Sequence, residues 1–147
     1  MKKFEFSLEK MLSFKDQMLS GEKLKLADLR SRLANLNEAL EKLHQEYTYC
    51  DGELKEQERT GLTPHDLARR KAYLNVLNDR IKSQQLQIRT MEARVNDQVA
   101  VVVRVSQEVT TLEKLKDRQM DEYRAAEGKE QELLIDEFIA NNSVSLN

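Results

Sequence analysis

The sequence predicts an all-α fold in which two long helices pair as an antiparallel coiled-coil hairpin. Apolar residues recur in heptads along most of the chain, which is the pattern of a coiled-coil seam. Only one strong helix break interrupts them, a turn near residues 59–64. The 147 residues include four Phe, four Tyr, no Trp, one Pro and four Gly. So few turn residues argue against a β-sandwich or barrel, and so little aromatic mass favours a thin core between helices over an enclosed pocket.

The first helix is expected over about residues 3–58. Every a and d position from Leu26 to Leu43 is Leu, which is a strong coiled-coil signal. Lys15 and Glu22 occupy earlier d positions, where polar residues lower stability but can fix the register of the two helices. The a positions of this helix are, in order, Leu12, Leu19, Leu26, Leu33, Leu40, Tyr47 and Leu54.

The break between the helices carries the residues that end one helix and start another. Gly61 can end a helix in the left-handed conformation. Thr63 is a good N-cap, Pro64 fits the first helical position, and Asp66 stands three residues after Thr63 like the acid of a capping box. A second helix is therefore expected to start near residue 64.

The second helix is expected over about residues 64–140 and is the longer of the two. Its heptad pattern is good as far as Leu112 and decays afterwards, although Arg70, Gln84 and Gln98 interrupt the d positions. Its apolar a positions are Leu67, Leu74, Ile81, Ile88, Val95, Val102 and Val109.

The short loop makes the two helices antiparallel neighbours. With the turn centred near residues 60–62, residue i lies opposite residue 121–124 minus i. Asp51 then faces Lys71, whereas Arg32 facing Arg94 is a like-charge mismatch.

This pairing leaves the end of the second helix without a partner. Residues from about 120 to 140 extend past the start of the first helix and carry an apolar cluster with nothing in the chain to cover it. Residues 121–147 hold seven acids and two bases, a charge of −5, while residues 1–120 carry +3. Such an end favours a basic or apolar partner surface, with fraying as the alternative. We expect a single hairpin domain over residues 1–140 and a disordered tail over 141–147. The apolar cluster consists of Leu133, Leu134, Ile135, Phe138 and Ile139.

The chemistry of an enzyme is missing from the sequence. Cys50 is the single cysteine and falls on a d position, so it is expected to be a small buried hydrophobe. His44 and His65 stand on different elements, and no nucleotide-binding, metalloprotease or serine-hydrolase motif occurs. We therefore expect no catalytic residue, no metal site, no cofactor and no small-molecule substrate. The net charge of −2 gives no pull toward nucleic acid.

The start of the chain lacks the apolar stretch of a signal peptide, and the longest apolar run covers only residues 99–103. A cytoplasmic location is the expectation. The wider apolar stretch, residues 99–105, fits a kink, a dimer contact or a third packing surface equally well.

Two groups of aromatic and apolar residues are candidates for binding a partner. Tyr47, Tyr49 and Tyr73 stand at one level near the turn, and exposed aromatic residues make good anchors. The alternative is that each ring lies flat on its neighbours. The second group crowds the start of the first helix, where the second helix is the alternative cover, and consists of Phe4, Phe6, Leu8, Met11, Leu12 and Phe14.

These residues resemble the FliJ family of flagellar export proteins. The opening Phe4-x-Phe6-x-Leu8, followed by Lys15, is similar to the start of that family. The mid-chain Gly61, followed after a spacer by Tyr73-Leu74-x-x-Leu77, is also similar. The length and the coiled-coil plan match over essentially the whole chain.

The resemblance implies a function as well as a fold. FliJ proteins are antiparallel coiled coils that resemble the gamma stalk of rotary ATP synthases and work in the flagellar type III export apparatus. The implied partners are a hexameric export ATPase, an export-gate membrane protein and export chaperones, and the implied location is cytoplasmic, peripherally associated with the membrane export apparatus.

The family picture also assigns the two candidate surfaces. Tyr73 and Leu77 match positions linked to gate binding, so Tyr47, Tyr49, Tyr73 and Leu77 become candidate gate contacts. The other end would enter the ATPase ring, with candidate contacts Phe4, Phe6, Met11, Phe14, Leu134 and Phe138.

The sequence leaves two alternatives to a flagellar stalk. One is a homodimeric structural coiled coil that buries residues 99–105 and 133–139. The other is the related stalk of a virulence-type secretion system. A prefoldin-like holdase would need β-strands between the helices, for which residues 60–66 are too short.

Overall fold

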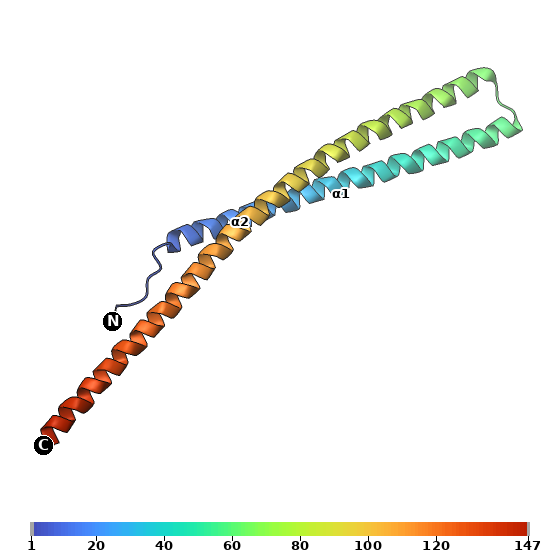
Figure 1. Cartoon of the computed structure of the whole chain (residues 1–147). Coiled ribbons are helices and arrows are strands. Elements are labelled where there is room, and N and C mark those ends of the chain that lie inside the picture. The colour runs from blue at the N-terminus through green and yellow to red at the C-terminus, as the bar shows by residue number, and fades with distance from the viewer. Residues whose placement is uncertain (1, 147) are drawn as a thin grey trace. The chain divides into compact units, whose positions relative to one another are not determined.

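A computed structural model describes residues 2–146 of the chain, and the side chains of residues 2–144. Helix α1 runs Glu9–Thr60 and helix α2 runs Pro64–Leu146, joined by residues 61–63 (Figure 1). The described residues form no strand. The predicted all-α fold of two long antiparallel helices, the second longer than the first, is confirmed.

The loop has the conformation that its residues predict. Gly61 has a φ of 112°, in the left-handed region that favours glycine, and its amide donates to the carbonyl of Gln57 at 3.0 Å. At the start of α2 the hydroxyl of Thr63 accepts a hydrogen bond from the amide of Asp66 at 3.2 Å. Thr63 is therefore the N-cap of α2, and Pro64 is its first residue.

Helix α1 begins at Glu9, although the sequence predicted a start near residue 3. Phe6 accounts for the difference. On a helix continued backwards, residue 6 would fall on position b and face water. As part of a non-helical segment it turns inward, where its side chain is only 7% exposed and packs with Leu12 and Val109. Burying this large apolar ring stabilises the non-helical start.

Helix α2 continues to Leu146, although the sequence predicted that it ends near residue 140. Residues 141–146 are helical here, where a disordered tail was expected, and Asn147 lies outside the described residues. Neither Gly nor Pro follows Gly128, so nothing in the sequence stops the helix. Extending an existing helix costs little, because each added residue also adds a hydrogen bond.

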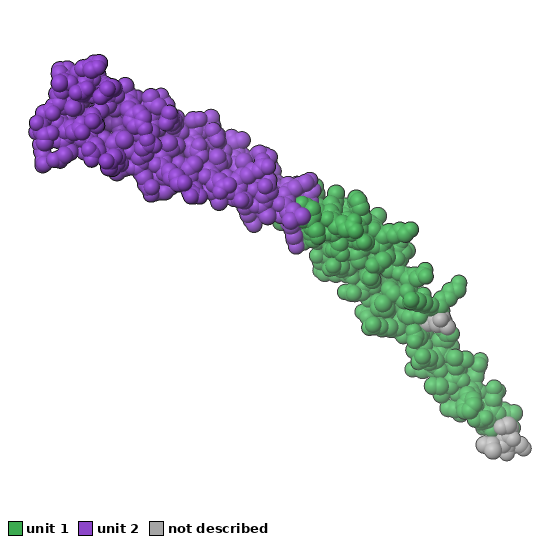
Figure 2. Space-filling model, turned by 180° about the vertical axis from the view of Figure 1, so that it is seen from behind, with its two compact units in different colours: residues 1–21, 103–147 green, residues 22–102 purple. Residues whose placement is uncertain are grey.

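The chain divides into two compact units, shown in green and purple in Figure 2. Unit 1 comprises Met1–Gly21 and Val103–Asn147, and unit 2 comprises Glu22–Val102. Each unit contains a segment of α1 and a segment of α2. The single hairpin domain over residues 1–140 stays a prediction.

Within unit 2, polar residues at core positions find partners on the other helix. The side-chain amide of Gln84 donates to the carbonyl of Leu36 at 3.0 Å, and that of Gln98 donates to the carbonyl of Glu22 at 3.0 Å. The predicted pairing places residues 85–88 opposite Leu36, so the observed pairing of unit 2 is shifted by at least one residue. Asp51 forms its ion pair with Lys55 on its own helix, at 3.0 Å.

Within unit 1 one ion pair between the helices falls inside the predicted pairing and the other lies one residue beyond it. Lys15 forms an ion pair with Glu108, inside the predicted range of 106–109. Lys116 pairs with Glu9 at 2.8 Å. The polar core residue Lys15 is thus neutralised by a carboxylate of the opposite helix, which reduces the cost of its half-buried position.

The core of each unit is the predicted seam of a and d positions. Leu77 is the most buried side chain, with an exposed fraction of 0%. Apart from Phe6, every buried hydrophobic side chain of the described residues stands at a predicted a or d position. In unit 2 these are Leu26, Leu54, Leu74, Leu77, Ile81, Ile88 and Val95, and in unit 1 they are Leu12, Val105 and Val109.

No helix in the described part of the chain is long and apolar enough to cross a membrane.

We expect the substitution Leu77→Ala to lower the free energy of unfolding by roughly 2 kcal/mol or more, because it removes a fully buried side chain and leaves a cavity. The substitution Leu86→Ala, on a side chain that is 64% exposed, is the matched control and should change it by less than about 0.5 kcal/mol. Urea unfolding followed by circular dichroism measures both. Equal losses for the two variants would contradict the seam as described.

Candidate interaction surfaces

The loop end of unit 2 carries a groove between α1 and α2 with a cavity volume of about 470 Å³. Tyr49 on α1 and Tyr73 on α2 line it, with 69% and 42% of their surfaces exposed. We call this surface the tyrosine groove, and its lining residues are Tyr49, Cys50, Glu53, Gln57, Arg69, Arg70 and Tyr73. The structure thus brings two of the three predicted tyrosines to one accessible surface.

A hydrogen bond between the helices holds the ring of Tyr73. Its hydroxyl donates to the carboxylate of Glu46 on α1. This hydrogen bond is the main reason why the pKa of Tyr73 lies above its ordinary value, with desolvation as the next cause. Tyr47 is half-buried at its seam position and does not line the groove.

Leu77 has no exposed surface, although it is one of the predicted gate contacts. Its side chain packs in the seam of unit 2. A direct contact between Leu77 and a partner would require the two helices to separate, so this contact stays a prediction.

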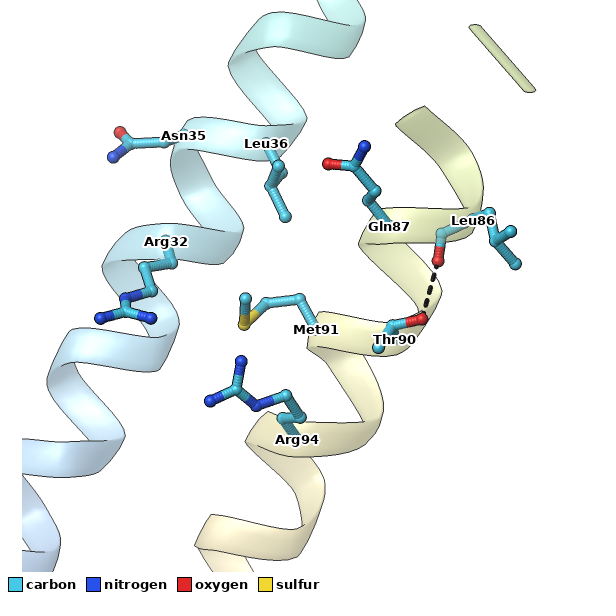
Figure 3. Close-up of a pocket in the computed structure, with 8 residues that line it drawn as sticks. All are labelled: Arg32, Asn35, Leu36, Leu86, Gln87, Thr90, Met91 and Arg94. Carbon is cyan, nitrogen blue, oxygen red and sulfur yellow. Dashed lines mark hydrogen bonds between the residues drawn. The ribbon is translucent and has the colours of Figure 1, made fainter. Parts of the chain in front are cut away.

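A second groove of unit 2 was missed at the sequence level. Leu36 and Met91 point toward one another from α1 and α2, and Arg32 and Arg94 flank them (Figure 3). Arg32 forms an ion pair with Asp28 on its own helix, at 3.0 Å. The like-charge mismatch of Arg32 and Arg94 was the one signal in the sequence that marked this place.

In unit 1 the predicted cluster at the start of the chain contains both buried and exposed side chains. The rings of Phe4 and Tyr123 lie 5.6 Å apart, centre to centre, and the hydroxyl of Tyr123 donates to the carbonyl of Lys2 at 2.6 Å. Phe4 is half-buried and Phe6 is buried. These contacts hold the non-helical start of the chain against α2, so both Phe residues are engaged within the unit.

Met11 and Phe14 belong to the same predicted cluster but are exposed. Their exposed fractions are 50% and 61%, so they remain accessible to a partner. Of the four predicted contacts at the start of the chain, these two are therefore the exposed ones.

Unit 1 ends in a helical segment that no described residue covers. All side chains of residues 128–144, which we call the C-terminal segment, are exposed. Leu134 and Phe138 are spaced four residues apart, as are Ile135 and Ile139, so the four side chains share one face of the helix. Their exposed fractions lie between 58% and 66%. These four apolar side chains are thus uncovered, as the sequence predicted.

Among the described residues, no group of three or more His, Cys, Asp or Glu side chains comes together in a way that could hold a metal ion. Cys50 forms no disulfide, is half-buried at its seam position, and lines the tyrosine groove.

Comparison with known proteins adds one match. The family model of the flagellar FliJ protein matches residues 4–145, which is nearly the whole chain. This chain belongs to the FliJ family. It is therefore a protein of flagellar export, as the resemblance in its sequence implied. No curated protein and no solved structure matches it. The family match includes both the tyrosine groove and the C-terminal segment.

We expect the substitution Glu46→Gln to lower the pKa of Tyr73, because it removes the carboxylate whose hydrogen bond and charge favour the protonated phenol. Since the folded-state pKa is raised, this interaction stabilises the hairpin below the unfolded-state pKa of about 10, and the stabilisation is lost as the pH rises through the folded-state value.

An NMR titration of the tyrosine ring carbons measures this shift residue by residue. An unchanged pKa of Tyr73 would show that the hydrogen bond does not form in solution.

Proposed function

We propose that this FliJ-family chain is a non-enzymatic stalk and adaptor of the flagellar export apparatus. In this proposal it binds the ring of the hexameric export ATPase and the export-gate membrane protein, and assists delivery of substrates by export chaperones. It would work in the cytoplasm, peripherally associated with the membrane export apparatus. Membership of the FliJ family supports this role.

The exposed apolar face of the C-terminal segment is the observation that carries the proposal. Burying a Leu, Ile or Phe side chain is worth about 1.5–3 kcal/mol, so four such side chains on one face represent a large unused contribution to binding. The segment continues α2, but most helical stability in proteins comes from packing of an apolar face, which this segment lacks. A partner that covers this face would therefore gain apolar contact and order the helix at once.

Charge suggests which kind of surface the C-terminal segment meets. Residues 121–147 carry a charge of −5, so a basic or apolar lining would attract this part of the chain and an acidic lining would repel it. We assign this segment, together with the exposed Met11 and Phe14, to the ATPase ring. Phe4 and Phe6 would act indirectly, by holding the start of the chain against α2.

The tyrosine groove is assigned to the export gate. Tyr49 and Tyr73 offer large exposed rings, and the hydrogen bond to Glu46 fixes the second ring before any partner binds. A side chain that is already ordered loses less conformational entropy on binding, which favours affinity. Tyr47 and Leu77 would support this surface from within the seam.

The double substitution Leu134→Ser and Phe138→Ser should abolish stimulation of the export ATPase and co-purification with it, because it removes the apolar face while leaving the seam intact. Helix content by circular dichroism should change little, since both side chains are exposed. ATP hydrolysis is measured with and without the full chain. The substitution Ala140→Ser, at another exposed position of the same segment, is the control and should leave stimulation unchanged.

Full stimulation by the double variant would overturn the assignment of the C-terminal segment. Sedimentation equilibrium of the wild-type chain tests the homodimeric alternative. A monomer at all concentrations excludes that alternative, whereas a dimer that the double variant disrupts would support it over the stalk.

A further inference from the structure

Arg70 contains the only buried side-chain nitrogen or oxygen atom without a hydrogen-bond partner among the described residues. That atom is its Nε, and the side chain lines the tyrosine groove. Arg70 stands at a d position of the seam, where the sequence would otherwise place an apolar residue. A buried N–H donor without a partner is costly, and native structures rarely retain one without a reason.

The described part of the chain supplies no acceptor for the enclosed Nε of Arg70. Other polar core residues of unit 2, such as Gln84 and Gln98, reach acceptors on the opposite helix, whereas the Nε of Arg70 reaches none among the described residues. Its neighbour Arg69 pairs with Asp66 at 3.6 Å. Arg69 and Arg70 together place two positive charges in the lining of the groove, against one negative charge from Glu53.

We propose that Arg70 forms a carboxylate subsite of the tyrosine groove. The occupant would be a segment of a partner protein that presents an Asp or Glu side chain next to an aromatic or aliphatic one. The guanidinium group binds carboxylates with charge-assisted, directional hydrogen bonds, and the exposed rings of Tyr49 and Tyr73 supply an apolar wall for the neighbouring side chain. Taking this partner as the export gate rests on the proposed function.

The dimensions of the groove fit such an occupant. Its volume of about 470 Å³ is within the range of about 300–1,000 Å³ that is typical of ligand sites, which suits a few side chains rather than a whole helix. Glu53 also lines the groove and is its one acidic residue. Its negative charge repels an incoming carboxylate, so removing that charge should strengthen binding.

The test uses a pair of small probes on the full chain. The ¹⁵N-labelled protein is titrated with 3-phenylpropionate and, separately, with the uncharged 3-phenylpropionamide, and the Nε–H signal of Arg70 is followed by NMR. We expect the carboxylate to shift this signal and the ring signals of Tyr49 and Tyr73. The amide should bind roughly tenfold or more weakly, because it offers no charge-assisted hydrogen bond to the guanidinium.

Variants separate the subsite from a general charge effect. Arg70→Gln should abolish the preference for the carboxylate, and Glu53→Gln should increase the affinity for it. Arg59→Gln, which removes a positive charge outside the groove, should leave both probes unchanged. If Arg70→Gln loses helix content, Tyr49→Ser, at an exposed position, replaces it and should weaken both probes. Equal binding of the two probes, or no shift at Arg70, would overturn the subsite.

A binding assay with the purified export gate distinguishes this proposal from the assigned function. If the wild-type chain binds the carboxylate probe and Arg70→Gln loses gate binding, the results support both the subsite and the gate as its partner. Binding of the probe without any gate binding keeps the subsite and overturns the gate as its partner. Unchanged gate binding by Arg70→Gln overturns the role of the subsite in that contact. Self-association that Arg70→Gln abolishes would make a second copy the occupant and contradict the proposal.

Discussion

A narrow stripe of Leu, Ile and Val side chains between α1 and α2 is the constraint on which the rest of this structure depends. Helix α1 has 52 residues and α2 has 83, and helices of such polar composition are held in place by packing rather than by their intrinsic propensity. The stripe is only one a and one d residue wide, so each of these side chains contributes a large share of the local packing. Leu77 and Val105 are almost completely buried, while most seam positions are only half-buried. A core this thin has no room for an enclosed site.

The same constraint determines where binding surfaces can lie. Seam side chains pack against one another and leave little accessible surface. A partner must therefore bind where the stripe widens, where it ends, or where it contains a polar residue. The tyrosine groove lies beside the polar residue Arg70, and the C-terminal segment lies after the seam has ended at Tyr123. Apolar surface in those two places contributes nothing to the packing of the hairpin. That is the physical reason for assigning binding to them rather than to the longer stretch between.

Heptad periodicity predicted the fold because burial in a coiled coil follows the sequence directly. The start of α1 could not be predicted in this way, since Phe6 becomes buried by leaving the helical pattern that the prediction assumed. The end of α2 was placed too early because residues 141–147 lack the helical pattern, although neither Gly nor Pro follows Gly128 to stop the helix. Tyr49 and Tyr73 were predicted as binding candidates only because the sequence places them at one level near the turn. The buried Nε of Arg70 was not, because the sequence shows a polar d position but not whether a partner meets it.

The central proposal is that the C-terminal segment stays uncovered until a partner binds. Hydrogen–deuterium exchange of the full chain, alone and with the export ATPase, tests this most directly, because backbone amides exchange slowly only where the helix is held in place. We predict slow exchange for residues 74–119 in both samples, fast exchange for residues 128–146 in the free chain, and protection of those residues when the ATPase is added. Slow exchange of residues 128–146 in the free chain, or no change on adding the ATPase, would contradict it.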